Sequence, residues 1–388
     1  MSGGLVRFVA RRLMVGTISL VVFSFLLFWM VEALIPGDFF SSQRLFMTQQ
    51  EVDALREQFG VDRPIPVRWW RWIGSFFSTG LGSSTFGGGV AATLRDAIVP
   101  TVFVFVTGLL IAYLIGQWLG RWTGWRSGIR SDAVTLSGIS LSTLFPPFLG
   151  FVITTVMALR LRMWRAAVFE DSRRQLWLNP PLQENDVLMA MTWTLVVGVI
   201  VAGVAGRIVW SWRRRRLPTW LKALIALVVT VDLWAWLGIL PWAVDLTFDA
   251  GLAVMAFSIL GFGEFMLIMQ TGMVGQLAED YVLTARAKGI STGAIRDRHA
   301  ARNASLAVVA RLAVSVPYLL TGLVIIERAV GWQGLGSFLF RAIDSQDIPV
   351  VASVLMVVGF ITLAVRLVLD ILTFALDPRI AQSGRPSP

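Results

Sequence analysis

The chain alternates long apolar runs with shorter segments that carry charge, glycine and proline. A helix of about 20 apolar residues crosses the roughly 30 Å hydrocarbon core of a bilayer. Because lipid offers no hydrogen-bond partners to the backbone, runs of this length predict helices. The pattern predicts eight membrane spans, at about Leu13–Ile35, Ala97–Leu119, Val134–Leu159, Val187–Trp210, Trp220–Pro241, Gly251–Met273, Leu306–Ile326 and Pro349–Leu376.

The composition agrees with this pattern. Of the 388 residues, 56% are hydrophobic and 15% charged, and the mean hydropathy is +0.70, which leaves too little polar surface for a soluble globule. The sequence therefore predicts an all-α, polytopic membrane protein with about eight transmembrane helices. No basic stripe with interleaved aromatic residues marks a nucleic-acid-binding domain, so the net charge of +10 is attributed to membrane topology.

Arginines precede the first span and lie between alternate spans; the predicted outer segments 44–95 and 160–174 also carry arginines, but acidic residues accompany them. Arg7, Arg11 and Arg12 precede the first span, and Arg213–Arg216 joins the fourth span to the fifth. Because loops rich in arginine stay on the cytoplasmic side of a membrane, both termini are predicted to be cytoplasmic. The same alternation places the segment Asp280–Asn303 in the cytoplasm.

Asp280–Asn303 is a charged, glycine-punctuated stretch between two apolar runs, and its arginines could not remain in hydrocarbon at acceptable cost. We expect two short helices here. Gly289 would end the first through a positive φ angle, and Ser291 would cap the second.

The motif Ala285–Gly289, followed by His299–Asn303, resembles the "EAA" loop of ABC-importer permeases, and most closely that of the dipeptide/oligopeptide/nickel permease family. The resemblance covers roughly the first 150 and the last 130 residues. It continues through Pro36–Asp38, Phe59–Pro66, Gly80–Ser83, Glu327, Gly331–Gly336, Asp347–Pro349 and Leu376–Ile380. The chain departs from the family pattern at Leu283–Ala285, which lacks the glutamate of the motif, and at Asn303–Ala307, which lacks a proline.

The resemblance implies a six-helix permease core, to which this chain adds a helical hairpin. The implied organisation is an N-terminal transmembrane helix (1–36), an external loop (37–96), core helices (97–160), an inserted segment with the extra hairpin (161–250), a second part of the core with a cytoplasmic coupling loop at 279–303 (251–380), and a cytoplasmic tail (381–388).

The resemblance also implies a function. The chain would be the permease subunit of an ATP-driven importer for peptides or similar small solutes, in the inner membrane of a prokaryote. Its partners would be a homologous second permease, two ATP-binding subunits that hold ATP and magnesium, an extracytoplasmic substrate-binding protein and the lipid bilayer. The residues expected to couple the permease to the ATPase are Thr284, Ala285, Arg286, Ala287, Lys288, Gly289, Ser291, His299, Arg302 and Asn303.

No enzyme site or cofactor is expected in this chain. A phosphate-binding P-loop needs a lysine after its second glycine, and neither Lys222 nor Lys288 has that setting. His299 is the single histidine and there is no cysteine, which leaves almost nothing for a zinc site or a catalytic triad. We expect no metal site and no catalytic residue.

Charges within predicted spans are candidates for the substrate pathway, because burying charge in lipid is costly. Glu264 is the leading candidate, and Glu327 is the second. Arg366 and Asp370 lie four residues apart, so they are expected to form a structural pair on one helix face.

Two other interpretations remain open from the sequence. The chain could be a stand-alone secondary transporter or channel, although no inverted repeat is evident. It could also be a non-catalytic membrane scaffold. The sequence does not distinguish dipeptides, longer peptides, nickel chelates or other solutes as substrates.

Overall fold

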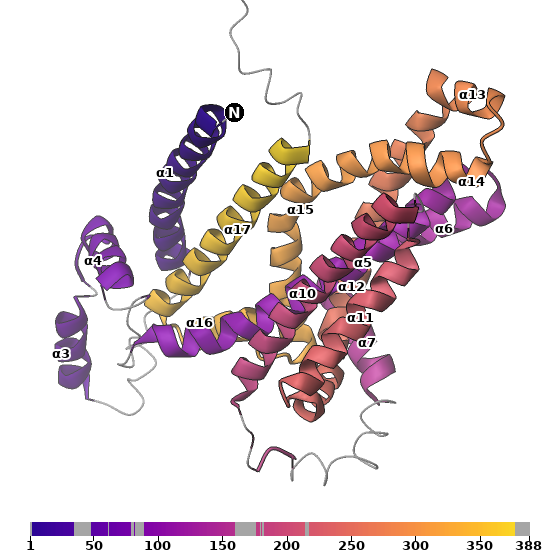
Figure 1. The fold of residues 1–388 in the computed structure, drawn as a ribbon. Coiled ribbons are helices and arrows are strands. Elements are labelled where there is room, and N and C mark those ends of the chain that lie inside the picture. The colour runs from indigo at the N-terminus through magenta and orange to yellow at the C-terminus, as the bar shows by residue number, and fades with distance from the viewer. Residues whose placement is uncertain are drawn as a thin grey trace, which may run out of the picture.

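The computed structural model of the chain describes residues 2–34, 48–60, 62–78, 81, 89–159, 176–178, 180, 182–213 and 217–376. Within these residues the structure is helical and contains no β-strand (Figure 1), which confirms the predicted all-α fold. Six described helices are long and apolar enough to cross a membrane, or eight if each of two bent pairs counts as one span. Several predicted features lie outside the described residues: Pro36–Asp38, all but Leu81 of Gly80–Ser83, the arginines 214–216, residues 377–380 and the tail 381–388.

Two long helices, α5 (Val90–Trp125) and α12 (Leu240–Leu277), form the centre of the molecule. They are in contact along their length because glycines on α5 leave room for the backbone of α12. A Cβ atom on Gly116, Gly120 or Gly124 would collide with backbone atoms of α12. Such small residues at intervals of four permit close helix packing in membranes.

A second apolar cluster joins α1 (Ser2–Leu34), α4 (Ile65–Ser78) and α17 (Ile348–Leu376). Trp72 of α4 is buried in it, and its indole Nε1 donates to the Pro349 carbonyl and to Ser353 Oγ, both at 3.2 Å. The segment predicted to be external therefore contains a helix, α4, that packs on the spans. The short helix α3 (Gln49–Phe59) precedes α4 and begins with a capping box between Thr48 and Glu51.

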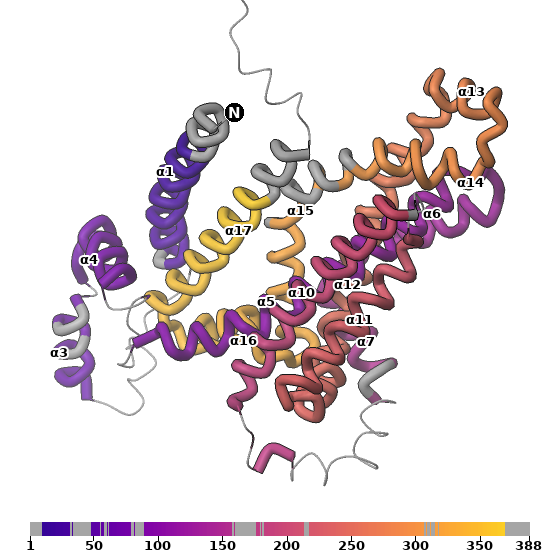
Figure 2. Tube along the Cα trace, in the orientation of Figure 1, coloured from indigo at the N-terminus to yellow at the C-terminus, as the bar shows by residue number. Residues whose placement is uncertain are grey.

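The predicted extra hairpin consists of α10 (Glu184–Arg213) and α11 (Thr219–Trp236). The two helices pack on each other and rest on α5 and α12 (Figure 2). Trp234 Nε1 donates to Thr194 Oγ1 at 2.8 Å across the hairpin. Only 6% of the apolar span Thr219–Trp236, which is α11, is buried, so this helix lies on the periphery. That the hairpin is an insertion remains a prediction.

The fifth predicted span, Trp220–Pro241, ends too late. α11 stops at Trp236, Gly238 turns the chain with φ +71°, and α12 begins at Leu240. Pro241 stands in the first turn of α12, where a missing N–H group costs no hydrogen bond. The sixth span is consequently longer than the predicted Gly251–Met273.

Two predicted spans are not straight. In place of Val134–Leu159 the structure has α6 (Ile129–Ser142) and α7 (Pro146–Ile153), the latter continuing into the π-helix η1 (Thr154–Ala158), with a bend of 103° between the two parts. Phe145 is extended because the residue before a proline disfavours helical angles.

The other bend follows α15 (Ala301–Val330), which contains the predicted span Leu306–Ile326. A 73° bend separates the end of α15 from α16 (Leu335–Asp344). Gly331 makes the turn with φ +80°, in the left-handed region that suits glycine.

Candidate functional site

The segment expected to couple with an ATPase projects from one end of α12 and α15 (Figure 1). It consists of α13 (Asp280–Ala287), the short turn α14 (Thr292–Ala294) and the π-helix η2 (Ile295–Ala300), which runs into α15. As expected from the sequence, Gly289 has a positive φ angle, +71°. Its N–H donates to the Arg286 carbonyl, and the N–H of Ile290 to the Ala285 carbonyl, so the open carbonyls at the end of α13 are satisfied.

Ser291 stands at the start of the second helical part, but the predicted cap is wrong in one respect. Its side chain makes no capping hydrogen bond. Its backbone carbonyl instead accepts from the N–H of Ile295 at 3.0 Å. The second part begins through its backbone alone.

The segment has a buried side and an exposed side. Val282, Ala285 and Ile295 form a small apolar cluster with Trp125 of α5 and with Tyr281. The other residues expected to take part in coupling are exposed: Thr284, Arg286, Ala287, Lys288, Gly289, Ser291, His299, Arg302 and Asn303. Leu283 is also exposed, at 61%. Ala285 therefore packs on the buried side of the segment, whereas Ala287 lies on the exposed side.

Gln276, near the end of α12, anchors both ends of the segment. Its Oε1 accepts from the Tyr281 hydroxyl at 2.7 Å and from Asn303 Nδ2 at 3.1 Å. Burial raises the pKa of Tyr281, so the phenol keeps its proton and remains a donor at neutral pH. Asn303 thus fixes the beginning of α15 to α12, and the sequence pattern gave no indication of Gln276 as its partner.

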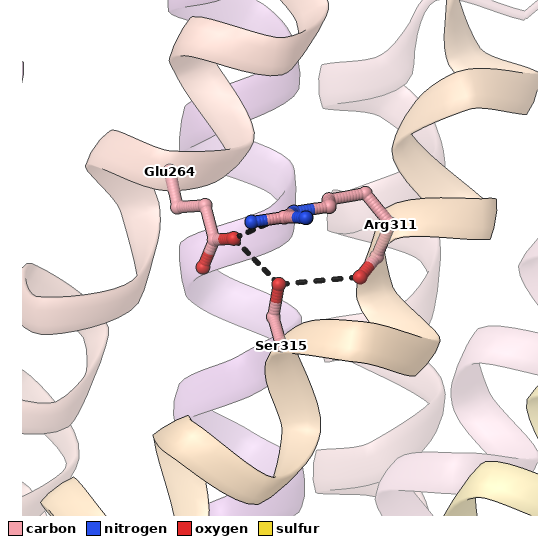
Figure 3. A network of polar contacts seen from close by, with 3 residues as sticks. All are labelled: Glu264, Arg311 and Ser315. Carbon is pink, nitrogen blue, oxygen red and sulfur yellow. Dashed lines mark hydrogen bonds and ion pairs between the residues drawn. The ribbon is translucent and has the colours of Figure 1, made fainter.

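Glu264 lies on α12 and is paired with two residues of α15 (Figure 3). Its Oε1 accepts from Ser315 Oγ at 2.6 Å and from Arg311 Nε at 3.3 Å. The exposed fraction of the side chain is 25% for Glu264 and 55% for Arg311. The sequence singled out Glu264 but not its partners, which lie about one helical turn apart on α15.

Glu327 has a different environment. Its side chain is fully buried, and it accepts from the Thr101 hydroxyl at 2.6 Å and from the N–H of Gly336 at 2.7 Å. The Thr101 oxygen accepts from the N–H of Leu335 at 2.8 Å. Glu327 and Thr101 together satisfy the first N–H groups of α16, which would otherwise have no partner. Glu264 and Glu327 have no hydrogen-bond partner in common.

The predicted pair of Arg366 and Asp370 is only partly described. Arg366 is exposed on α17, and the side chain of Asp370 lies outside the described part. Among the residues that the structure describes, no three His, Cys, Asp or Glu side chains gather as metal ligands.

Comparison with known proteins identifies the architecture. Residues 190–382 match the family described as "Binding-protein-dependent transport system inner membrane component", and residues 5–92 match the corresponding N-terminal family. The chain belongs to this family of inner-membrane permease components of binding-protein-dependent transport systems.

Relatives of similar extent support the assignment. The chain is 27% identical to a putative peptide permease protein of Brucella ovis over 385 residues, covering 97% of this chain and 99% of the relative. It is 28% identical to an oligopeptide transport system permease protein of Mycobacterium tuberculosis over 380 residues, and 25% identical to a glutathione transport system permease protein of Salmonella typhi over 383 residues, with the same coverage of 97% and 99%. The protein is thus a multi-pass membrane permease component of an importer and not a catalytic enzyme, and its family works with ATPase and substrate-binding subunits.

Proposed function

We propose that this chain forms half of the translocation path of an ATP-driven importer for peptides or similar small solutes. A homologous second permease would form the other half. Two separate ATP-binding subunits would hold ATP and magnesium, and an extracytoplasmic binding protein would deliver the solute. The names of the relatives support the substrate class, since they are peptide, oligopeptide and glutathione permeases, and glutathione is itself a short peptide.

The observation that carries the coupling role is the exposed helix–glycine–helix segment at Asp280–Ala300, which is joined without a flexible linker to two long helices. Its exposed side offers Leu283 and Ile290 among basic residues, a combination suited to docking in a cleft of another protein. Its buried side rests on Trp125, and Gln276 holds both ends. A push on the exposed side would therefore move α5, α12 and α15 together.

Alternating access follows from such a connection. Closure of the two ATPase subunits around ATP would draw the docked segments of the two permeases together, and the long helices would rotate as rigid bodies. Release after hydrolysis would reverse the motion. The permease would contribute no bond-breaking chemistry.

The first experiment is purification of the chain from its native membrane in mild detergent, with identification of the associated proteins and an assay of ATP hydrolysis. Recovery with a second permease and ATPase subunits is expected. An ATP-indifferent homo-oligomer would contradict the proposal.

Substitution at Gly289 then tests the coupling role. An added Cβ there would meet no other atom within 4 Å, so the cost of Gly289→Val lies in the positive φ angle, about 1–2 kcal/mol. We expect Gly289→Val to reduce substrate-stimulated ATP hydrolysis several-fold by distorting the docking surface. Gly289→Asn should retain most of it, because asparagine tolerates this conformation.

Gly275→Val is the matched control for added bulk. Gly275 is also exposed with nothing within 4 Å of an added Cβ, but it lies in α12 without a positive φ angle. Its substitution should leave coupled hydrolysis unchanged. Wild-type hydrolysis in Gly289→Val, measured in the assembled complex, would remove this segment from the coupling mechanism.

A further inference from the structure

The surface of α15 differs from that of the other long helices. The described residues of α15 that are exposed all carry a polar group: Arg302, Asn303, Arg311, Tyr318, Thr321 and Arg328. The exposed surface of α1, by contrast, is dominated by large apolar side chains such as Ile18, Val22 and Leu26, as expected of a helix in contact with lipid. The exposed side chains of α15 that the structure describes therefore do not form a lipid-facing surface like that of α1.

Four of these residues form one strip. Arg311, Tyr318, Thr321 and Arg328 follow one another at intervals of seven, three and seven residues, which places them on one face of the helix. The strip is about 25 Å long measured along the helix. Arginine facing hydrocarbon is costly, so this face borders water or protein.

The Glu264–Arg311 pair fixes the depth of the strip. Glu264 lies within the candidate span Leu240–Leu277, about 20 Å from the α13 end of α12 at 1.5 Å per residue. Arg311 contacts it at 3.3 Å and so lies at the same depth. The pair is thus well inside the apolar part of the bundle, yet Arg311 remains 55% exposed.

Arg311 has hydrogen-bonding capacity that the described residues do not use. A guanidinium group carries five N–H donors, and only Nε donates to Glu264 (Figure 3). Within the described residues, no other interaction engages the group. The Nη1–Nη2 edge is left for an external acceptor, and the carboxylate behind it holds the planar group in place. Ser315 fixes that carboxylate in turn, through the 2.6 Å bond to the same oxygen.

We infer that Arg311 binds the carboxylate at the C-terminus of the transported peptide, and that Glu264 and Ser315 are positioning residues for it. The inference rests on the proposed importer function and adds a contact residue to it. The two-pronged edge of arginine matches the two oxygens of a carboxylate, which lysine does not. Glu264 neutralises part of the positive charge, which keeps the contact weak enough for the solute to leave again. Tyr318, 56% exposed on the same face, offers a further contact about two turns along.

The experiment uses the full importer complex in proteoliposomes, with its own binding protein and ATP. ATP-driven uptake is measured for one peptide in two forms, with a free C-terminal carboxylate and with a C-terminal amide. The quantity compared is the ratio of kcat/KM for acid to that for amide, relative to the wild-type ratio. Because every preparation contains the same binding protein, the preference of that protein cancels.

Arg311→Lys keeps the charge and a bond to Glu264 but loses the two-pronged edge. We expect it to lower the acid-to-amide ratio by about tenfold, and the double variant Glu264→Gln, Arg311→Gln to lower it by up to about a hundredfold, as for loss of a charged hydrogen bond. The double variant leaves no unpaired charge in the bundle. Arg207→Gln is the control, since Arg207 is exposed on α10 of the hairpin and its loss should not change the ratio.

Two results would overturn the inference. One is an unchanged ratio in Arg311→Lys and in the double variant while ATP-driven uptake persists. The other is loss of the second permease from the complex in either variant, which would make the strip a subunit contact. If the wild-type complex hydrolyses ATP but accumulates neither peptide, the proposed peptide function fails before any variant is compared.

Discussion

Replacing Thr101 with valine tests the anchor that holds α16 against α5. Valine has nearly the same shape as threonine but neither donates nor accepts. The substitution removes the 2.6 Å bond to Glu327 and leaves the N–H of Leu335 without its acceptor. Both groups are buried, so water does not replace the lost partner.

The size of the effect follows from these two losses. A hydrogen bond contributes about 0.5–1.5 kcal/mol net, and a buried N–H without an acceptor costs about 1–3 kcal/mol. Hydrogen bonds between membrane helices measure toward the low end of such ranges. Thr101→Val should therefore destabilise the chain by about 2–3 kcal/mol.

Thr107→Val is a control on the same helix. The hydroxyl oxygen of Thr107 is buried without a hydrogen-bond partner. Its replacement by a methyl group should change stability by less than about 0.5 kcal/mol, or raise it slightly, because no bond is lost. Both variants thus replace a threonine of α5 with valine, but only Thr101→Val is expected to lower the stability.

The assay is unfolding of the purified chain in mixed micelles of mild detergent and sodium dodecyl sulfate, followed by far-ultraviolet circular dichroism. Amide hydrogen exchange of the region 331–345, measured by mass spectrometry, locates the effect. Thr101→Val should accelerate exchange there and Thr107→Val should not. Equal midpoints and equal exchange in the two variants would refute the argument that Glu327 and Thr101 anchor α16.

Two further predictions concern packing and pH. A Cβ on Gly263 would collide with the Gly138 carbonyl of α6, whereas one on Gly251 would meet nothing within 4 Å. In the same unfolding assay, Gly263→Ala should lower the stability by about 1–3 kcal/mol. Gly251→Ala should keep a midpoint near that of the wild type. Equal midpoints would show that α6 does not depend on this contact. Hydrogen bonds from the backbone N–H and the hydroxyl of Thr48 lower the pKa of Glu51. The Glu51 carboxylate therefore stabilises the first turn of α3 fully above the ordinary glutamate pKa, about 4.3. This stabilisation is lost as the pH falls through the lowered pKa. Amide exchange in α3 should accelerate in that acidic window beyond the intrinsic pH effect, and an equal acceleration in Glu51→Gln would contradict this role.

The sequence predicted the helices well because their signal is strong and local. An apolar run of more than 20 residues must satisfy its own backbone in lipid, so its conformation does not depend on distant residues. The bends were missed for the converse reason, since hydropathy is continuous through Val134–Leu159 and carries no information on direction. The adjacent prolines Pro146 and Pro147 were the available signal.

The candidate site shows the same division. Gly289 could be predicted because its φ angle follows from the local end of a helix. The partners of Glu264 and Glu327 could not, because Arg311 is 47 residues from Glu264 and Thr101 is 226 residues from Glu327. Only packing of α12, α15 and α5 brings them together. The glycines of α5 at intervals of four were visible in the sequence, but which helix they would face was not.

The length of α12 has a mechanical consequence. Its 38 residues form a rod about 57 Å long, with no proline after Pro241. One end is tied to Leu176 and Trp177 through Trp242 and Asp245, and the other carries Gln276. A tilt of about 10° about the midpoint would displace each end by about 5 Å in opposite directions. α12 can thus act as a lever: a small tilt of the helix at its midpoint displaces both of its ends, one at each membrane surface, by more than the length of a bond between atoms.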